Sequence, residues 1–271
     1  MPEAPRAAVT VPYVRTRKRR DGATALVMVT AYDTPTARIV DAAGVDIILV
    51  GDSVADNVLG HDDTLQVTMA DMVHHTAAVA RARPRALVVG DLPWLSYHLD
   101  VSETVRNGAA LVRAGASAVK LEGGRARLPM VEALLGAEIP VMGHLGLTPQ
   151  SVHAMGGYRV QGRADAEAAS LLDDASALAG AGCFAIVVEG VPASLGAAVA
   201  ERVDVPVIGI GAGPGCDGQV LVFHDLVGLN ERSPRFARRY AELAEVIGAA
   251  VGAYAEDVRS GRFPTEGESY H

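Results

Sequence analysis

Ionisable residues follow short apolar runs of this chain, each at the point where the run ends. They are Asp52, Asp91, Glu122, His144 and Glu189. Parallel strands end at one common edge, and in a barrel that edge carries the catalytic groups. Acidic residues also mark turns and helix N-caps, which would explain any one of them. Five such residues at the same relative position instead favour one shared site.

Lys120 adds a positive charge to this set. It lies two residues before Glu122 in a Val-rich run, so both side chains point to the same side of a strand. A lysine away from solvent needs a carboxylate partner or an anionic ligand. The residues leave two interpretations open: a buried Lys120–Glu122 ion pair with no further role, or a charge that binds an anionic substrate.

The donor atoms of Asp52, Asp91 and Glu122 indicate which metal such a site would prefer. All three offer hard oxygen ligands. Magnesium binds through a few carboxylates and keeps water or substrate oxygens in its other positions. Zinc would require more His or Cys than these runs supply. We therefore expect a Mg²⁺ site.

Two other groups of residues have types that could do chemistry. The glycine-rich stretch Gly209–Gly215 is similar to a phosphate loop. Pro214 and the lack of a downstream acidic partner argue against a dinucleotide site, so we expect close approach of the backbone to a ligand. Cys183 and Cys216 have no neighbouring base, and we expect buried, unreactive thiols.

The elements that must position these residues alternate along the chain. Eight apolar runs are nearly continuous in Val, Ile and Leu, as strands buried on both faces are. The expected strands are 26–30, 46–50, 86–90, 118–121, 140–143, 184–188, 207–210 and 219–223. Segments of helical period fall at 35–43, 70–83, 101–114, 128–135, 164–179 and 193–202. Thr68 and Ser102 are expected N-caps, and Gly115 and Gly180 expected helix ends.

This order predicts the α/β class and a single (β/α)₈ TIM-type barrel over residues 1–271. A doubly wound sheet would usually carry a phosphate-binding fingerprint after its first strand, and Thr30-Ala31-Tyr32-Asp33 is not one. Residues 1–24 are an N-terminal extension. Residues 234–259 are predicted to form one or two extra C-terminal helices. The long connection His144–Arg163 is expected to be functional.

Composition excludes several classes of protein. The chain has 271 residues, of which 49% are hydrophobic and 21% charged, as in a folded soluble domain. Its 24 Lys and Arg against 32 Asp and Glu give a net charge of −8, which argues against nucleic acid or an anionic membrane as partner. The basic run 15–20 is expected to be solvated. Two cysteines cannot form a disulfide framework, so we expect a cytoplasmic protein.

Several motifs together closely resemble the ketopantoate hydroxymethyltransferase family. They are Thr30–Asp33, Val50-Gly51-Asp52-Ser53, Asp91-Leu92-Pro93, Val119–Gly124, Gly143–Ser151, Gly156–Arg163 and Gly209–Gly213. The similarity runs from about Leu26 to His271. It implies a (β/α)₈ barrel, Mg²⁺, a role in pantothenate biosynthesis and a cytoplasmic homo-oligomer, typically a decamer.

The resemblance also implies roles for single residues. Asp52, Asp91 and Glu122 match the family's magnesium ligands, whereas Asp52, Ser53, Asp91 and Lys120 match its keto-acid contacts. Glu189 matches its proposed catalytic base, and His144 is a possible supporting group. Gly90 and Gly190 depart from the family pattern beside these positions, which puts local packing in question.

The implied reaction transfers a hydroxymethyl group from 5,10-methylenetetrahydrofolate to 3-methyl-2-oxobutanoate through a Mg²⁺-stabilised enolate, giving 2-dehydropantoate. Composition alone leaves two alternatives. One is a Mg²⁺-dependent carbon–carbon lyase or mutase that acts on another 2-oxo acid. The other is a non-catalytic barrel scaffold, which the set of charged residues opposes, because buried charges without a ligand cost stability.

Overall fold

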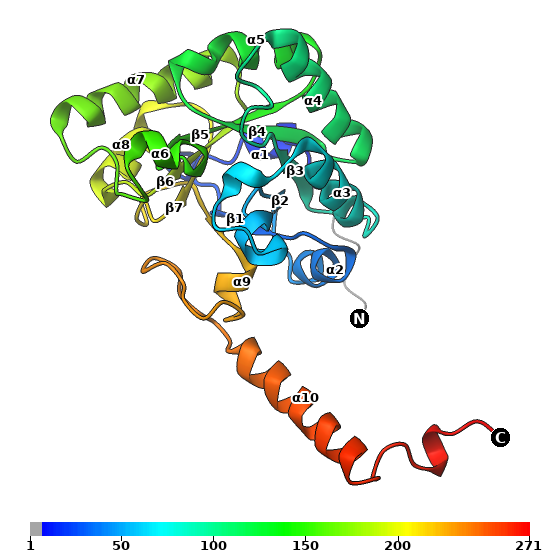
Figure 1. The fold of residues 1–271 in the computed structure, drawn as a ribbon. Helices are drawn as coiled ribbons and strands as arrows, with labels where there is room; N and C mark the ends of the chain where they lie inside the picture. The colour runs from blue at the N-terminus through cyan, green and yellow to red at the C-terminus, as the bar shows by residue number, and fades with distance from the viewer. Residues whose placement is uncertain (1–6) are drawn as a thin grey trace. The chain divides into compact units, whose positions relative to one another are not determined.

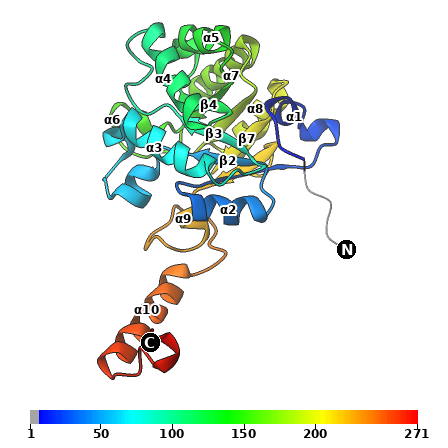
Figure 2. The ribbon, with the colours of Figure 1, turned by 90° about the vertical axis from the view of Figure 1, so that its right-hand side faces the viewer.

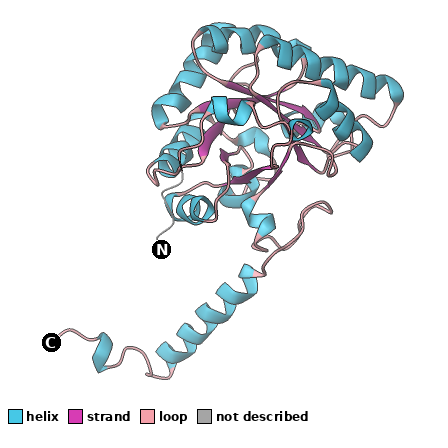
Figure 3. Cartoon of the chain, turned by 180° about the vertical axis from the view of Figure 1, so that it is seen from behind, coloured by secondary structure: helices cyan, strands magenta, loops and turns pink. Residues whose placement is uncertain are grey.

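Eight short parallel strands close into a barrel in chain order in the computed structural model, which describes residues 7–271 (Figure 1). The strands are β1 (Leu26–Thr30), β2 (Ile47–Val50), β3 (Leu87–Asp91), β4 (Ala118–Glu122), β5 (Val141–Gly146), β6 (Ala185–Glu189), β7 (Val207–Ile210) and β8 (Gly218–Leu221). Helices surround these strands (Figure 3). The predicted fold class is confirmed, and each apolar run forms a strand.

The strand ends differ from the prediction in a way that affects the site. β3, β4 and β6 each extend one residue further, so that Asp91, Glu122 and Glu189 are the last residues of their strands. β5 continues to Gly146 and contains His144. These polar residues join the ladder because their backbone groups pair with the neighbouring strands while their side chains meet at the barrel's C-terminal edge.

The helices that follow the strands confirm most of the predicted segments. They are α2 (Thr34–Ala42), α3 (Met69–Ala80), α4 (Val101–Ala114), α5 (Leu128–Gly136), α7 (Asp165–Ala181) and α8 (Ala193–Arg202). Thr68 caps α3 in a capping box with Asp71, and Gly115 ends α4. Ser102 was wrong as a cap, because the Asp100 side chain accepts from Glu103 N. Gly180 was also wrong, since α7 continues and ends before Gly182 at φ +109°.

The N-terminal segment packs against the barrel. Val14 of α1 (Val11–Arg15) is fully buried in the core cluster. The turn after α1 lies against α8, where Arg20 donates to Glu201 O (Figure 2). Lys18 is 2% exposed and donates to Ala200 O and Asp217 Oδ2, each at 2.6 Å. The expectation of a solvated basic run was therefore wrong at Lys18, because an ion pair and backbone carbonyls satisfy its charge.

The glycine-rich stretch after β7 serves packing between elements. A Cβ at Gly213 would lie 2.4 Å from Ala193 Cβ, and one at Gly215 would lie 2.6 Å from Ala197 Cβ. Both alanines belong to α8. The expected close approach is thus to a helix. The two glycines that depart from the family pattern are also compatible with the local packing. At Gly90 a Cβ would make only van der Waals contacts, the nearest at 3.4 Å, so glycine leaves little empty space there. Gly190 has a backbone φ of +56°, a conformation that favours glycine.

Residues 223–271 form a second compact unit. It contains α9 (Phe223–Leu226), α10 (Leu243–Arg259) and the 3-10 turn η6 (Glu266–Glu268). Of the predicted helical tail, residues 243–259 are helical and residues 234–242 are not. No residue of α10 is buried. None of the helices in residues 7–271 combines the length and apolar character needed to span a bilayer.

Candidate active site

A cavity of about 100 Å³ lies at the C-terminal ends of the strands. It brings together all of the predicted site residues, and these are Asp52, Ser53, Asp91, Lys120, Glu122, His144 and Glu189. The strand register explains why these side chains meet, because Asp91 of β3 is paired with Lys120 of β4, and Glu122 of β4 is paired with His144 of β5. Side chains of paired residues on the same face are neighbours.

Lys120 is buried and makes its ion pair with a different carboxylate from the one that the spacing suggested. Its Nζ lies 3.1 Å from Asp91 Oδ1. Burial lowers the pKa of Lys120, but the carboxylates of Asp91 and Glu122 outweigh burial and raise it above its usual value. The lysine therefore remains charged inside the barrel edge.

The carboxylates crowd one another in this cavity. Burial, with the neighbouring charges of Asp91 and Glu122, holds the pKa of Asp52 well above its usual value. Burial also raises the pKa of Asp91, although Lys120 opposes that shift. Such crowding costs free energy that a nearby cation would recover, since opposite charge favours the ionised form of a carboxyl group.

His144 bridges two of the acidic residues. Its Nδ1 lies 3.3 Å from Glu122 Oε1, and its Nε2 lies 3.3 Å from Glu189 Oε2. Nδ1 is also 3.3 Å from Lys120 Nζ. Burial and Lys120 lower the pKa of His144, but contacts with the two glutamates raise it to about 9. The imidazole thus carries charge at neutral pH and connects the carboxylates of β4 and β6.

Ser53 has a hydroxyl partner at the cavity wall. Tyr32 Oη lies 2.8 Å from Ser53 Oγ, and burial raises the pKa of Tyr32. Asp33, in the same motif, is the N-cap of α2 and accepts from Thr36 N at 2.7 Å. The segment after β1 therefore contributes a tyrosine to the surroundings of Ser53, and its aspartate belongs to the helix.

Gln150 and Tyr97 are polar residues of this region that the sequence analysis missed. Gln150 lies in the 3-10 turn η5 (Pro149–Ser151), within the long connection after β5. Its Nε2 donates to Asp52 Oδ2 at 2.7 Å, and its Oε1 accepts from Tyr97 Oη at 2.6 Å. Neither residue ends an apolar run. Two signals could have directed attention to Gln150: the length of that connection and its place within the motif Gly143–Ser151.

The donor chemistry of the site fits a hard divalent cation. Asp91 Oδ1 and Glu122 Oε1 are buried carboxylate oxygens, and their contacts are with the cationic groups Lys120 Nζ and His144 Nδ1. Four carboxylates face only one lysine and one histidine, which leaves an excess of negative charge. No three His, Cys, Asp or Glu side chains of residues 7–271 converge as ligands of one ion, so the fit rests on the donors and the charge.

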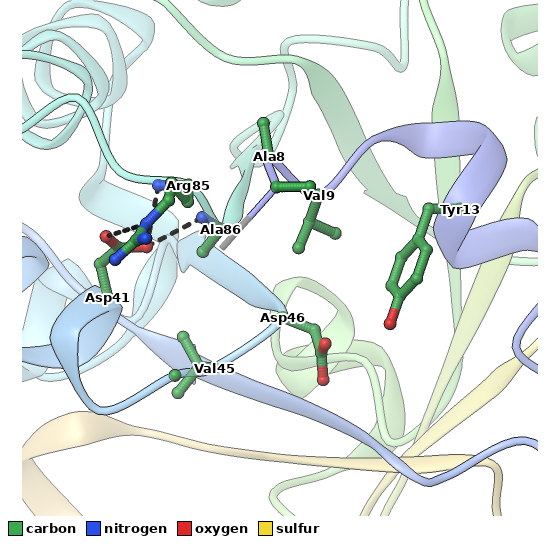
Figure 4. A pocket seen from close by; sticks show the side chains of 10 residues that line it. Ala8, Val9, Tyr13, Asp41, Val45, Asp46, Arg85 and Ala86 are labelled. Carbon is green, nitrogen blue, oxygen red and sulfur yellow. Dashed lines mark hydrogen bonds and ion pairs between the residues drawn. The ribbon is translucent and has the colours of Figure 1, made fainter. Parts of the chain in front are cut away.

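A second cavity, of about 310 Å³, lies at the N-terminal ends of β2 and β3 (Figure 4). Asp41 accepts there from the backbone N of Arg85 and of Ala86, each at 2.9 Å. Asp46 accepts from Val27 N. Because backbone donors already hold both carboxylates, the acidic groups of this cavity serve to join the elements of the barrel.

The closed barrel and the charged residues that line the cavity at the C-terminal ends of its strands define the class of this protein. It is a (β/α)₈-barrel enzyme, because such enzymes have their active sites at this end of the barrel. The sequence profile described as ketopantoate hydroxymethyltransferase matches residues 8–266. This chain belongs to that family.

Curated relatives cover most of the chain. A 3-methyl-2-oxobutanoate hydroxymethyltransferase of Methylobacterium sp. (strain 4-46) is 59% identical over 246 residues, 90% of this chain and 85% of the relative. That of Pelobacter propionicus is 53% identical over 268 residues, 98% of each chain. That of Moorella thermoacetica is 53% identical over 269 residues, 98% of this chain and 99% of the relative.

Solved structures with the same fold are more distant in sequence. A 2,3-dimethylmalate lyase of the PEP mutase/isocitrate lyase superfamily aligns with a TM-score of 0.62 at 17% identity, over 98% of this chain and 93% of that one. Phosphonopyruvate hydrolase in complex with oxalate and Mg²⁺ aligns with a TM-score of 0.61 at 13% identity, over 97% and 92%. At these identities the likeness concerns the fold alone.

Proposed function

We propose that this chain transfers a hydroxymethyl group from 5,10-methylenetetrahydrofolate to 3-methyl-2-oxobutanoate, giving 2-dehydropantoate and tetrahydrofolate with uptake of one water. Membership of the ketopantoate hydroxymethyltransferase family supports this reaction. The observation that supports the location of the active site is the cavity that brings Asp52, Asp91 and Glu122 together with Lys120, His144 and Glu189.

Each residue takes a role that its place supports. Asp52, Asp91 and Glu122 would hold Mg²⁺, because they supply buried oxygen donors and an excess of negative charge. When bound, Mg²⁺ would polarise the oxygens of the 2-oxo acid and stabilise negative charge that develops there. Lys120, charged and buried, attracts the anionic substrate, and Ser53 offers it a hydroxyl.

Glu189 removes the proton from C3 of the keto acid. It is the last residue of β6, and its side chain is 16% exposed, so it faces the cavity and remains reachable by a substrate. His144 Nε2 lies 3.3 Å from Glu189 Oε2, so the imidazole is the cationic neighbour of this carboxylate. A positioned carboxylate within reach of the C3 proton acts as a general base.

The activity is tested by turnover with and without a chelator. The purified chain is supplied with 3-methyl-2-oxobutanoate, methylenetetrahydrofolate and Mg²⁺, and 2-dehydropantoate is measured. Product that EDTA abolishes and added Mg²⁺ restores supports the proposal. Cleavage of a carbon–carbon bond in another 2-oxo acid, without hydroxymethyl transfer, would favour the lyase or mutase alternative.

We also propose that the chain works as a cytoplasmic homo-oligomer. Ile247, Val251, Tyr254 and Val258 form one exposed apolar stripe on α10. Both cysteines are free thiols, as in a reducing compartment. Light scattering should give a mass several times that of one chain, and Val251→Glu should lower it. A wild-type monomer at micromolar concentration would contradict the oligomer.

A further inference from the structure

Neighbouring N–H groups hold one oxygen of each carboxylate that is proposed as a metal ligand. Asp91 Oδ2 accepts from Asp52 N at 3.1 Å. Gln150 alone holds the other two: its side-chain Nε2 donates to Asp52 Oδ2 at 2.7 Å, and its backbone N donates to Glu122 Oε2 at 3.0 Å. The opposite oxygens, Asp91 Oδ1 and Glu122 Oε1, lie 3.1 Å from Lys120 Nζ and 3.3 Å from His144 Nδ1. One polar residue thus constrains two of the three carboxylates.

Tyr97 determines which way the Gln150 amide points. The backbone N of Glu122 donates to Tyr97 Oη at 3.1 Å, and an amide N–H can only donate. The Tyr97 hydroxyl hydrogen is therefore available for Gln150 Oε1, at 2.6 Å. This contact turns the amide NH₂ group toward Asp52 Oδ2 and toward Leu92 O, at 3.0 Å.

The network is buried and its groups are satisfied. Gln150 is 5% exposed and Tyr97 is 1% exposed. Oε1 of Gln150 has a donor, and its Nε2 has two acceptors. A buried polar network of this kind holds its members in one arrangement, because any rotation leaves a desolvated group without a partner.

We propose that Gln150, oriented by Tyr97, is a positioning residue that makes Asp52 bind the metal through a single oxygen. This inference rests on the proposed function. Mg²⁺ requires six ligands in octahedral geometry, whereas Ca²⁺ takes six to eight and readily accepts bidentate carboxylates. With Asp52 restricted to one oxygen, the site would favour the smaller ion, Mg²⁺, over Ca²⁺.

The test is binding of Mg²⁺ and Ca²⁺ to the substrate-free enzyme, measured by titration calorimetry beside the melting temperature. Gln150→Met keeps the length of the side chain and removes its amide. We expect its Mg²⁺ affinity to fall about 10- to 100-fold, the usual scale for a partner of a metal ligand. Ca²⁺ affinity should fall much less, because a released Asp52 can bind Ca²⁺ through both oxygens. Tyr97→Phe should shift the Mg²⁺/Ca²⁺ ratio in the same direction by less.

Leu92→Val is the matched control. It shortens an apolar side chain beside the network and keeps the backbone carbonyl that accepts from Gln150. It should lower the melting temperature and leave the Mg²⁺/Ca²⁺ ratio unchanged.

Four results would overturn the inference. One is a Gln150→Met enzyme whose Mg²⁺ affinity equals that of the wild type. Another is a Gln150→Met enzyme whose affinities for Mg²⁺ and Ca²⁺ fall by the same factor. If Gln150→Met does not fold, an unchanged ratio in Tyr97→Phe decides against the proposed role. A wild-type enzyme that binds neither ion contradicts the metal site of the proposed function, and this inference with it.

Discussion

Glu189→Gln is the substitution that separates proton transfer from binding. Glutamine has nearly the shape of glutamate and keeps an acceptor oxygen for His144 Nε2, which lies 3.3 Å from Glu189 Oε2. The amide has no basicity comparable with that of a carboxylate. The substitution therefore removes the base while retaining most of the packing around it.

The expected loss is in kcat. A positioned general base contributes about 10²- to 10⁴-fold, which corresponds to about 3 to 5 kcal/mol of activation free energy. The ion contact with His144 cannot account for a loss of this size, because it is a 3.3 Å contact without a hydrogen bond and the Glu189 side chain is 16% exposed. The KM for the keto acid should change little, since Lys120 and the metal ligands are untouched.

Steady-state kinetics over both substrates at saturating Mg²⁺ provide the measurement. Glu132→Gln, an exposed residue of α5, is the control for the same chemical change, and its kcat should match that of the wild type. A Glu189→Gln enzyme that retains kcat within threefold of the wild type would refute the assignment. A different group would then have to remove the C3 proton, and the charged imidazole of His144 is not suited to do so at neutral pH.

Three further predictions follow from buried groups. Lys120→Met should raise the KM for the keto acid about 10- to 100-fold with a smaller effect on kcat, because it removes a buried charge near the substrate. An unchanged KM would leave Lys120 only as the partner of Asp91. Lys18→Met should lower the free energy of unfolding by about 3 to 5 kcal/mol, because Asp217 loses its buried partner. Arg20→Met, at an exposed pair with Asp204, should cost about 1 kcal/mol or less, and equal losses in urea melts would contradict the difference. Cys183, whose pKa burial raises to about 12, should react with a thiol reagent at pH 8 only as the chain unfolds. Rapid labelling of the native enzyme would disprove its burial.

The fold could be predicted because most of the strands are short, apolar and buried on both faces, with Val27 of β1 and Gln219 of β8 as exposed exceptions. Such runs in a chain that alternates strand and helix favour a parallel sheet covered by helices, and the absence of a phosphate-binding fingerprint after the first run favoured a barrel over a doubly wound sheet. Helix ends were harder to place, because neighbouring residues offered equivalent caps: Asp100 lies two residues before Ser102, and Gly182 two residues after Gly180. Local chemistry made both choices reasonable, and packing decided between them.

The site was predictable where a residue ended a strand, and elsewhere it was not. Parallel pairing places strand ends together, so Asp91 and Glu122 could be grouped from sequence alone. Gln150 and Tyr97 lie on connections, and only the folded chain brings them to Asp52 and Glu122. Lys18 appeared to be part of an exposed basic run because its partner Asp217 is 199 residues away.

Loss of the C3 hydrogen of 3-methyl-2-oxobutanoate in D₂O tests the central claim most directly. The enzyme is incubated with the keto acid and Mg²⁺ without the folate donor, and the C3–H signal is followed by proton NMR. The account predicts exchange well above the enzyme-free rate, abolished by EDTA and strongly reduced in Glu189→Gln. Exchange at the enzyme-free rate, or exchange that EDTA leaves unchanged, would contradict it.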